Sequence, residues 1–195
     1  MGVRKLQTYI ESPQTPRSVF RNNVKIEELK ETYLKENPGS KVELLFDLEC
    51  CMYHLFPQDR VDAKYGGEFS NVVEILKEFY EKFNKIGVKV VTFFGNSKSK
   101  GRRSQWIERR YSDITKVNGF MRYNEPLTKM PSDLEDTMAA VIQFILKEPI
   151  VHSLTENDNE IVAYARKHKS FGILSQDPDY VIAHAATYYL PIRHV

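Results

Sequence analysis

Short apolar runs, each about the length of a β-strand, alternate along this chain with longer segments whose apolar residues recur at helical spacing. The expected strands are residues 42–47, 88–94, 149–154 and 171–174, with a fifth around Tyr188 and Tyr189. The expected helices are about 24–36, 69–86, 132–148 and 158–168. Because parallel neighbours are joined through crossover helices, this alternation predicts an α/β fold with a mostly parallel central sheet flanked by helices.

Composition limits the classes of protein to which the chain can belong. Its 195 residues, 42% of them apolar, suit one domain with a genuine core. The 28 basic and 26 acidic residues give a net charge of only +2, so bulk charge indicates no partner. The two cysteines, Cys50 and Cys51, are adjacent and cannot close an ordinary disulfide loop, which indicates a reducing compartment, the nucleus or cytoplasm. No apolar stretch approaches the length that would cross a membrane.

Acidic residues follow three of the expected strands at the point where each strand ends. They are Asp47 after the first strand, Glu156 and Asp158 after the third, and Asp177 and Asp179 after the fourth. In open parallel sheets the ligand crevice lies outside the carboxyl ends of the strands. We therefore expect these five carboxylates, from three separate stretches of the chain, to face one crevice.

Such a group of carboxylates predicts a metal site. Like charges a few Å apart raise one another's pKa unless a cation neutralises them. Oxygen-only ligands favour Mg²⁺ or Mn²⁺, and one or two such ions can activate a water and stabilise the leaving oxygen in phosphodiester cleavage. The site forms only if the strand order brings these strands together.

Each acid also has a purely structural interpretation. Asp47 can cap a helix that starts near Leu48. The sequence Asp177-Pro178-Asp179 can be a turn, since Asp and Pro both favour turns. Thr155 with Asp158 three residues later can be a capping box, in which Glu156 merely favours the helix dipole.

Several segments together carry a family resemblance: "MGVRKLQTYIE", "LLFDLECCMYHLF", "YGGEF" and "TENDNEIVAYARKHKSFGILSQDPDYVI", in this order. They resemble the asteroid family and the related constitutive coactivator of PPAR-gamma family, within the flap endonuclease and XPG superfamily of PIN-like domains. The resemblance runs from Met1 to about Ile182. It implies one PIN-like domain over residues 1–195, without the family's later acidic ligand and downstream helical duplex-binding region.

The resemblance also implies roles for the acids and reveals one departure. Residues that match acidic metal ligands of active members are Asp47, Glu156, Asp158, Asp177 and Asp179. Where active relatives carry an Asp at the end of the second strand, this chain has Phe94 in "TFFGN". A phenyl ring cannot ligate a metal ion, and Asn96 two residues later offers only a neutral oxygen. The coactivator branch has an aromatic at this position and is regarded as RNA-binding or scaffold proteins.

A basic segment follows the second strand. Its cations are Lys98, Lys100, Arg102, Arg103, Arg109 and Arg110, with Trp106 among them. In nucleases of the superfamily the corresponding segment forms a basic, partly helical arch over the site that guides single-stranded nucleic acid. The cations would contact phosphates and Trp106 would stack on a base. The alternative is a solvated helical face with Trp106 packed into the core.

Two functions of different classes follow. The first is a nucleic-acid-binding PIN-like domain with a divalent-metal crevice, a nuclease weakened by Phe94 that acts on single-stranded or flapped DNA or RNA. The second is a catalytically inactive RNA-binding or scaffold protein that uses the basic segment and binds protein partners. The five acids favour the first function, and Phe94 favours the second.

Overall fold

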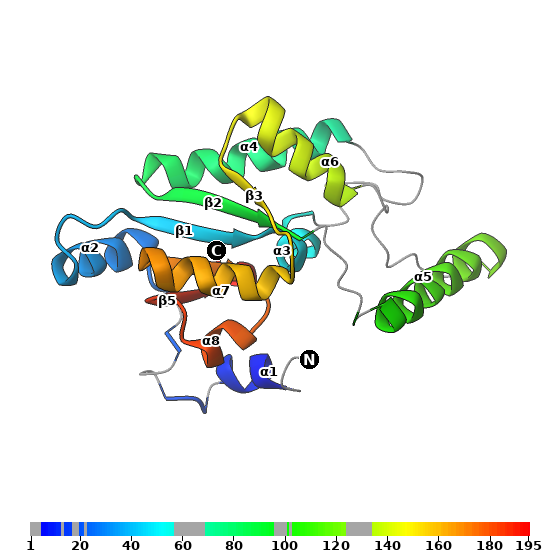
Figure 1. The fold of residues 1–195 in the computed structure, drawn as a ribbon, viewed down its shortest axis with the longest axis horizontal. Coiled ribbons are helices and arrows are strands. Elements are labelled where there is room, and N and C mark those ends of the chain that lie inside the picture. Colours follow the sequence, from blue (N-terminus) through cyan, green and yellow to red (C-terminus); the bar gives the residue numbers. More distant parts are fainter. Residues whose placement is uncertain are drawn as a thin grey trace.

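A parallel β-sheet forms the centre of the protein (Figure 1). The structure is a computed structural model and describes residues 5–12, 14–16, 20–21, 23–56, 69–95, 101, 103–123 and 134–195. Within them the strands are β1 (Glu43–Asp47), β2 (Lys89–Phe94), β3 (Ile150–His152), β4 (Gly172–Ser175) and β5 (Tyr188–Pro191). The strand order is β3-β2-β1-β4-β5, and every neighbouring pair is parallel. The predicted α/β class is therefore confirmed.

Helices connect successive strands. In the first half of the chain these are α1 (Leu6–Ile10), α2 (Ile26–Glu36), α3 (Leu48–Leu55), α4 (Phe69–Lys85) and α5 (Arg103–Tyr123). Later come α6 (Leu134–Ala140), the π-helix η2 (Val141–Leu146), α7 (Asn157–His168), α8 (Asp179–Ala183) and the 3₁₀-helix η3 (Ile192–His194). None of the helices that the structure describes has both the length and the apolar character needed to cross a bilayer.

The two faces of the sheet carry separate apolar clusters. Figure 1 shows α4 and α6 over one face and α7 and α8 over the other. Because side chains of a strand alternate between faces, Leu44 and Phe46 of β1 pack in the cluster with α3, α4 and α6. Leu45 between them packs with Ile161 of α7 and Tyr180 of α8. Burial on both faces is why the three central residues of β1, 44–46, are all apolar.

The strand order determines where a ligand would bind. Strand β1 lies at the centre, with β2 on one side and β4 on the other. The chain therefore reverses its direction of progress across the sheet at β1, and such a switch point is where open parallel sheets place their functional residues. Asp47 is the last residue of β1, and Ser175 is the last residue of β4.

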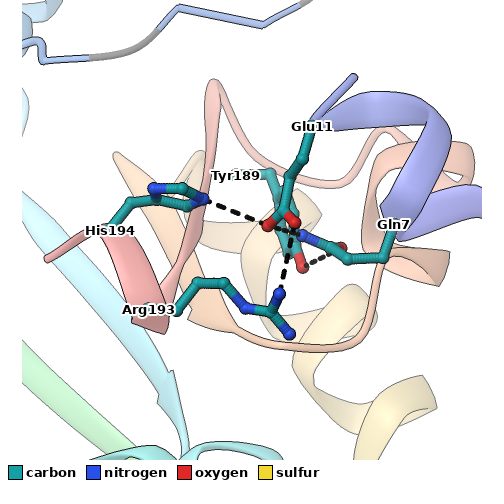
Figure 2. Close-up of polar contacts among 5 residues, drawn as sticks. All are labelled: Gln7, Glu11, Tyr189, Arg193 and His194. Carbon is teal, nitrogen blue, oxygen red and sulfur yellow. Dashed lines mark hydrogen bonds and ion pairs between the residues drawn. The ribbon is translucent and has the colours of Figure 1, made fainter. Parts of the chain in front are cut away.

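A polar cluster attaches α1 to the C-terminal end of the chain (Figure 2). Glu11 pairs with Arg193 at 3.4 Å and with His194 at 3.2 Å, and Gln7 also hydrogen-bonds to Glu11. The Tyr189 hydroxyl donates to Gln7 Oε1 at 3.2 Å. The N-terminal helix is thus held beside β5 and η3.

The expected helices and strands were found with small shifts in their ends. The helix expected over 132–148 differs most, since it changes from α6 to the π-helix η2 at Val141. Its expected cap, Ser132, lies outside the described residues. The strand expected over 149–154 is limited to Ile150–His152.

A substitution at Phe46 tests whether the core beneath the candidate site is packed as described. Its ring is fully buried and packs 4.8 Å from the ring of Phe79. Phe46→Ala should lower the free energy of unfolding by about 3–5 kcal/mol, because it removes buried apolar area and leaves a cavity. Leu154→Ala, at a side chain that is 85% exposed, is the control and should change stability by less than about 0.5 kcal/mol. Urea denaturation of both variants measures the difference, and equal losses would contradict this assignment of the core.

Candidate functional site

The side chain of Asp47 lies at the centre of the candidate site. It is fully buried and accepts hydrogen bonds from protein donors on both oxygens. The Cys50 backbone N–H (3.5 Å) and Asn157 Nδ2 (3.2 Å) donate to Oδ1. The hydroxyls of Ser175 and Tyr180, each at 3.0 Å, donate to Oδ2. These donors belong to α3, α7, β4 and α8, so one carboxylate joins four elements at the carboxyl edge of the sheet.

Asp47 therefore also has the structural role that the sequence allowed. It is the N-cap residue of α3, and its side chain accepts from the Cys50 N–H in the first turn. Burial raises its pKa above the ordinary aspartate value, although the hydrogen bonds that it accepts act in the opposite direction.

Acids from the other strand ends lie near Asp47. The Tyr180 hydroxyl also lies 3.3 Å from Asp158 Oδ1, so its single O–H is shared between the two carboxylates and bridges them. The pKa of Asp177 is raised by burial and by the nearby charges of Asp179 and Asp158. Three of the predicted strand-end stretches thus meet. We use the term acidic cluster for Asp47, Glu49, Asp158, Asp177 and Asp179.

The segment after β4 also forms the turn that its sequence allowed. Asp177 Oδ1 accepts from the backbone N–H of Asp179 at 3.0 Å, the pattern of an Asx-turn. The backbone N–H of Asp177 donates to the Ser175 hydroxyl oxygen at 3.0 Å. Since that hydroxyl donates to Asp47, the turn is joined to the buried carboxylate through Ser175.

Glu156 differs from the other predicted acids because the hydrogen bond described for it is made within its own helix. It is the N-cap residue of α7, and its Oε2 accepts from Asn159 in the same helix at 3.3 Å. The capping box that the sequence allowed between Thr155 and Asp158 does not form. The partner of Thr155 is Glu160, whose Oε1 accepts from the Thr155 N–H (2.6 Å) and hydroxyl (2.8 Å), because the helix begins one residue later than a Thr155 cap requires.

Glu49 is a member of the acidic cluster that the sequence reasoning missed. Burial and the charges of Glu135, Asp47 and Asp158 raise its pKa to about 8. Its position two residues after a buried aspartate, in the first turn of α3, was the available signal. Gly95 permits the close packing here, because a Cβ on it would lie 2.7 Å from Asn157 Cβ and 3.3 Å from Glu49 Oε2.

Phe94, which the family resemblance matches to an acidic position of active relatives, belongs to the apolar core. It is 3% exposed at the end of β2, and its ring lies 5.7 Å from the ring of His152. Asn96, whose neutral side-chain oxygen is the weak substitute that the sequence offers, lies outside the described residues. The side chain at the end of β2 therefore contributes packing and no ligand.

The hydrogen bonds of Asp47 do not fit a divalent metal ion at this carboxylate. A carboxylate has about four lone-pair positions, and four protein donors occupy those of Asp47. Among the residues that the structure describes, no group of three or more His, Cys, Asp or Glu side chains is arranged to hold a metal. The oxygen chemistry of the acidic cluster suits Mg²⁺ or Mn²⁺, but the positions on Asp47 that a cation would need are taken by hydrogen-bond donors.

The part of the basic segment from Arg103 onward lies in the exposed helix α5. Of its 21 residues only Gly119 is buried, and Figure 1 shows the helix standing apart from both helical layers, on the side toward which the strands point. Arg109 lies close enough to Glu49 to lower the pKa of that carboxyl group. The helix therefore lies beside the acidic cluster.

Trp106 is on the surface of α5 and not in the core. It is 38% exposed, and the Arg110 guanidinium lies 5.5 Å from the centre of its ring. Arg103 and Arg109 are exposed, and Arg110 pairs with Asp113 at 3.5 Å. The other predicted cations, Lys98, Lys100 and Arg102, lie outside the part of the chain that the structure describes.

The parallel sheet, its switch point and the acids at its carboxyl edge define a nuclease-like PIN fold. The catalytic core of Rad2 in complex with DNA superimposes with a TM-score of 0.55 at 15% identity, over 90% of this chain and 46% of that one. A second complex of the same core gives a TM-score of 0.52 at 14% identity, over 88% of this chain and 46% of that one. At this identity the likeness shows the fold alone.

Comparison with known sequences indicates the family that this chain resembles. No protein-family model matches the chain. The human constitutive coactivator of peroxisome proliferator-activated receptor gamma is 27% identical over 197 residues, which cover 97% of this chain and 21% of the relative. The zebrafish single-strand DNA endonuclease ASTE1 is 26% identical over 199 residues, which cover 100% of this chain and 26% of the relative. The resemblance to the asteroid and constitutive coactivator family, within the flap endonuclease superfamily, is thus confirmed.

This chain spans only about a fifth to a quarter of the length of these relatives. What their names say of activity and partners applies to those proteins.

Glu49 should make stability depend on pH. A raised folded-state pKa means that the folded protein binds the proton more tightly than the unfolded chain does. The stability from this group is complete below about pH 4.5 and is lost as the pH rises to about 8, by at most about 1.4 kcal/mol per pH unit. Glu49→Gln should flatten this part of the curve and raise stability at pH 8 relative to the wild type.

Chemical denaturation across this pH range measures the effect. Glu74→Gln removes the same charge from the exposed face of α4 and serves as the control, with a small expected effect because solvent screens the charge. An unchanged slope in the Glu49 variant would contradict its placement in the acidic cluster.

Proposed function

We propose that this domain binds single-stranded or flapped DNA or RNA through α5, beside the acidic cluster. The observation that carries the proposal is the exposure of this helix, which has one buried residue in 21 and lies next to the carboxyl edge of the sheet. A helix that packs so little against its own domain has its surface available for a ligand.

The chemistry of α5 suits a nucleic acid. Its sequence contains five basic residues, Arg103, Arg109, Arg110, Lys116 and Arg122, against two acidic ones, Glu108 and Asp113. Exposed arginines contact phosphates, and an aromatic face such as that of Trp106 can stack on an unpaired base. The DNA-bound Rad2 core and the single-strand DNA endonuclease among the relatives support this ligand class.

We further propose that binding, and not metal-dependent cleavage, is the main activity. Asp47 is engaged by four protein donors, and Phe94 supplies apolar packing at the end of β2. Two positions that a nuclease of this fold would use for metal are thus committed to the protein's own structure.

Phosphodiester cleavage with Mg²⁺ or Mn²⁺ is a second candidate function, favoured by one observation. Burial raises the pKa of Glu49, and the charges of the neighbouring acids raise it further, a repulsion that a bound cation would relieve.

The double variant Arg103→Ala, Arg109→Ala tests the binding proposal. Its affinity for a labelled single strand should fall by about tenfold or more at moderate salt, because two phosphate contacts are lost. The slope of log affinity against log salt should fall by about 1.4, since each single-strand contact accounts for about 0.7. Fluorescence anisotropy over a salt series, with DNA and RNA of one sequence, measures both quantities.

A matched control removes the same charge elsewhere. Lys82 and Lys85 are exposed at the end of α4, near the amino edge of the sheet, and their double alanine variant should bind like the wild type. If both double variants lost affinity equally, only non-specific charge would be at work and the role of α5 would be wrong.

Cleavage assays separate the two candidate functions. With Mn²⁺ or Mg²⁺ and labelled single-stranded or flapped substrates, the wild type should show no cleavage above that of Asp177→Asn, because Asp47 is already occupied by donors. Product formed by the wild type and absent from the variant would establish the second candidate in place of the first.

A further inference from the structure

The hydroxyl of Tyr180 lies between two carboxylates of the acidic cluster. It is 3.0 Å from Asp47 Oδ2 and 3.3 Å from Asp158 Oδ1. The side chain comes from α8 and is only 4% exposed, whereas Asp47 ends β1 and Asp158 lies in the first turn of α7. One hydroxyl group therefore joins acids from two other elements.

These distances are those of hydrogen bonds. Mg²⁺ lies about 2.1 Å from its oxygen ligands. An ion held jointly by Asp47 and Asp158 would need the space between them, which the phenol oxygen occupies. The hydroxyl reduces the repulsion between the two acids by donating a hydrogen bond, whereas a cation would do so by its charge.

The remaining donors fix Asp47 in this arrangement. Asn157 donates to its Oδ1, and the Ser153 hydroxyl orients that amide by donating to Asn157 Oδ1 at 2.7 Å. Ser175 donates to Oδ2 beside Tyr180. For the carboxylate to turn toward a cation it would have to break several of these bonds, each made in a buried environment.

We propose that the Tyr180 hydroxyl occupies the place of a bridging divalent cation between Asp47 and Asp158 and so excludes Mg²⁺ and Mn²⁺ from this pair of acids. Tyr180 is then a positioning residue that determines the metal affinity of the site. This inference is independent of nucleic-acid binding by α5, so either can fail without the other.

The variant Tyr180→Phe tests the proposal, since it removes only the hydroxyl and keeps the ring. Calorimetric titration with Mn²⁺ near neutral pH, without nucleic acid, should show binding at least about tenfold tighter than that of the wild type. The melting temperature should be lower than that of the wild type without metal, and Mn²⁺ should raise it more in the variant than in the wild type.

Tyr33→Phe is the matched control. Tyr33 is equally buried, and its hydroxyl donates to the backbone carbonyl of Lys169 at 2.7 Å, so the control also removes one hydrogen bond of a buried tyrosine. It should leave Mn²⁺ affinity at the wild-type value, which would separate exclusion of the ion from a general loosening of the fold.

A measurement on the wild type keeps the proposal testable if Tyr180→Phe does not fold. At about 1 mM Mn²⁺, the backbone amide NMR signals of Cys50 and Ser175 should show no paramagnetic broadening. Both residues donate hydrogen bonds to Asp47. Broadening of these signals would overturn the proposal, as would a folded Tyr180→Phe variant that binds Mn²⁺ no more tightly than the wild type.

Discussion

The buried carboxylate of Asp47 is the constraint on which the rest of the site depends. A charge removed from water costs several kcal/mol unless hydrogen bonds replace the lost hydration. The four donors to Asp47 come from α3, α7, β4 and α8, so these elements must pack in one arrangement to satisfy it. The same bonds that fix the carboxyl edge also determine which chemistry is available there.

Much of the fold could be predicted because it rests on local patterns. Residues 44–46 of β1 are all apolar since the strand is buried on both faces, and α4 keeps helical spacing since one side of it covers the sheet. In a parallel sheet all carboxyl ends lie at one edge, so acids after three strands could be assigned to that edge without knowledge of the strand order.

The partners of those acids could not be predicted in the same way. Tyr180, Asn157 and Ser175 reach Asp47 only because β4 lies beside β1 and because α7 and α8 cover one face, and no local pattern encodes that order. The rule that a buried carboxylate needs donors was available, but it names no residue. The capping box that the sequence allowed at Thr155 does not form for a related reason, since Glu160 accepts from both the backbone N–H and the hydroxyl of Thr155.

Phe94 and the hydrogen bonds of Asp47 have the same physical consequence. An aromatic ring at the end of β2 supplies apolar contact and no metal ligand, while the Tyr180 hydroxyl gives Asp47 and Asp158 a partner that is not a cation. Each of these two features stabilises the carboxyl edge in the absence of metal. A site that is already stable without metal gains less free energy of unfolding from binding one. The exposed arginines and Trp106 of α5 depend on neither change, because phosphate contacts and stacking require no ion at the acids. The proposed binding by α5 is therefore independent of whether the acidic cluster holds a metal ion.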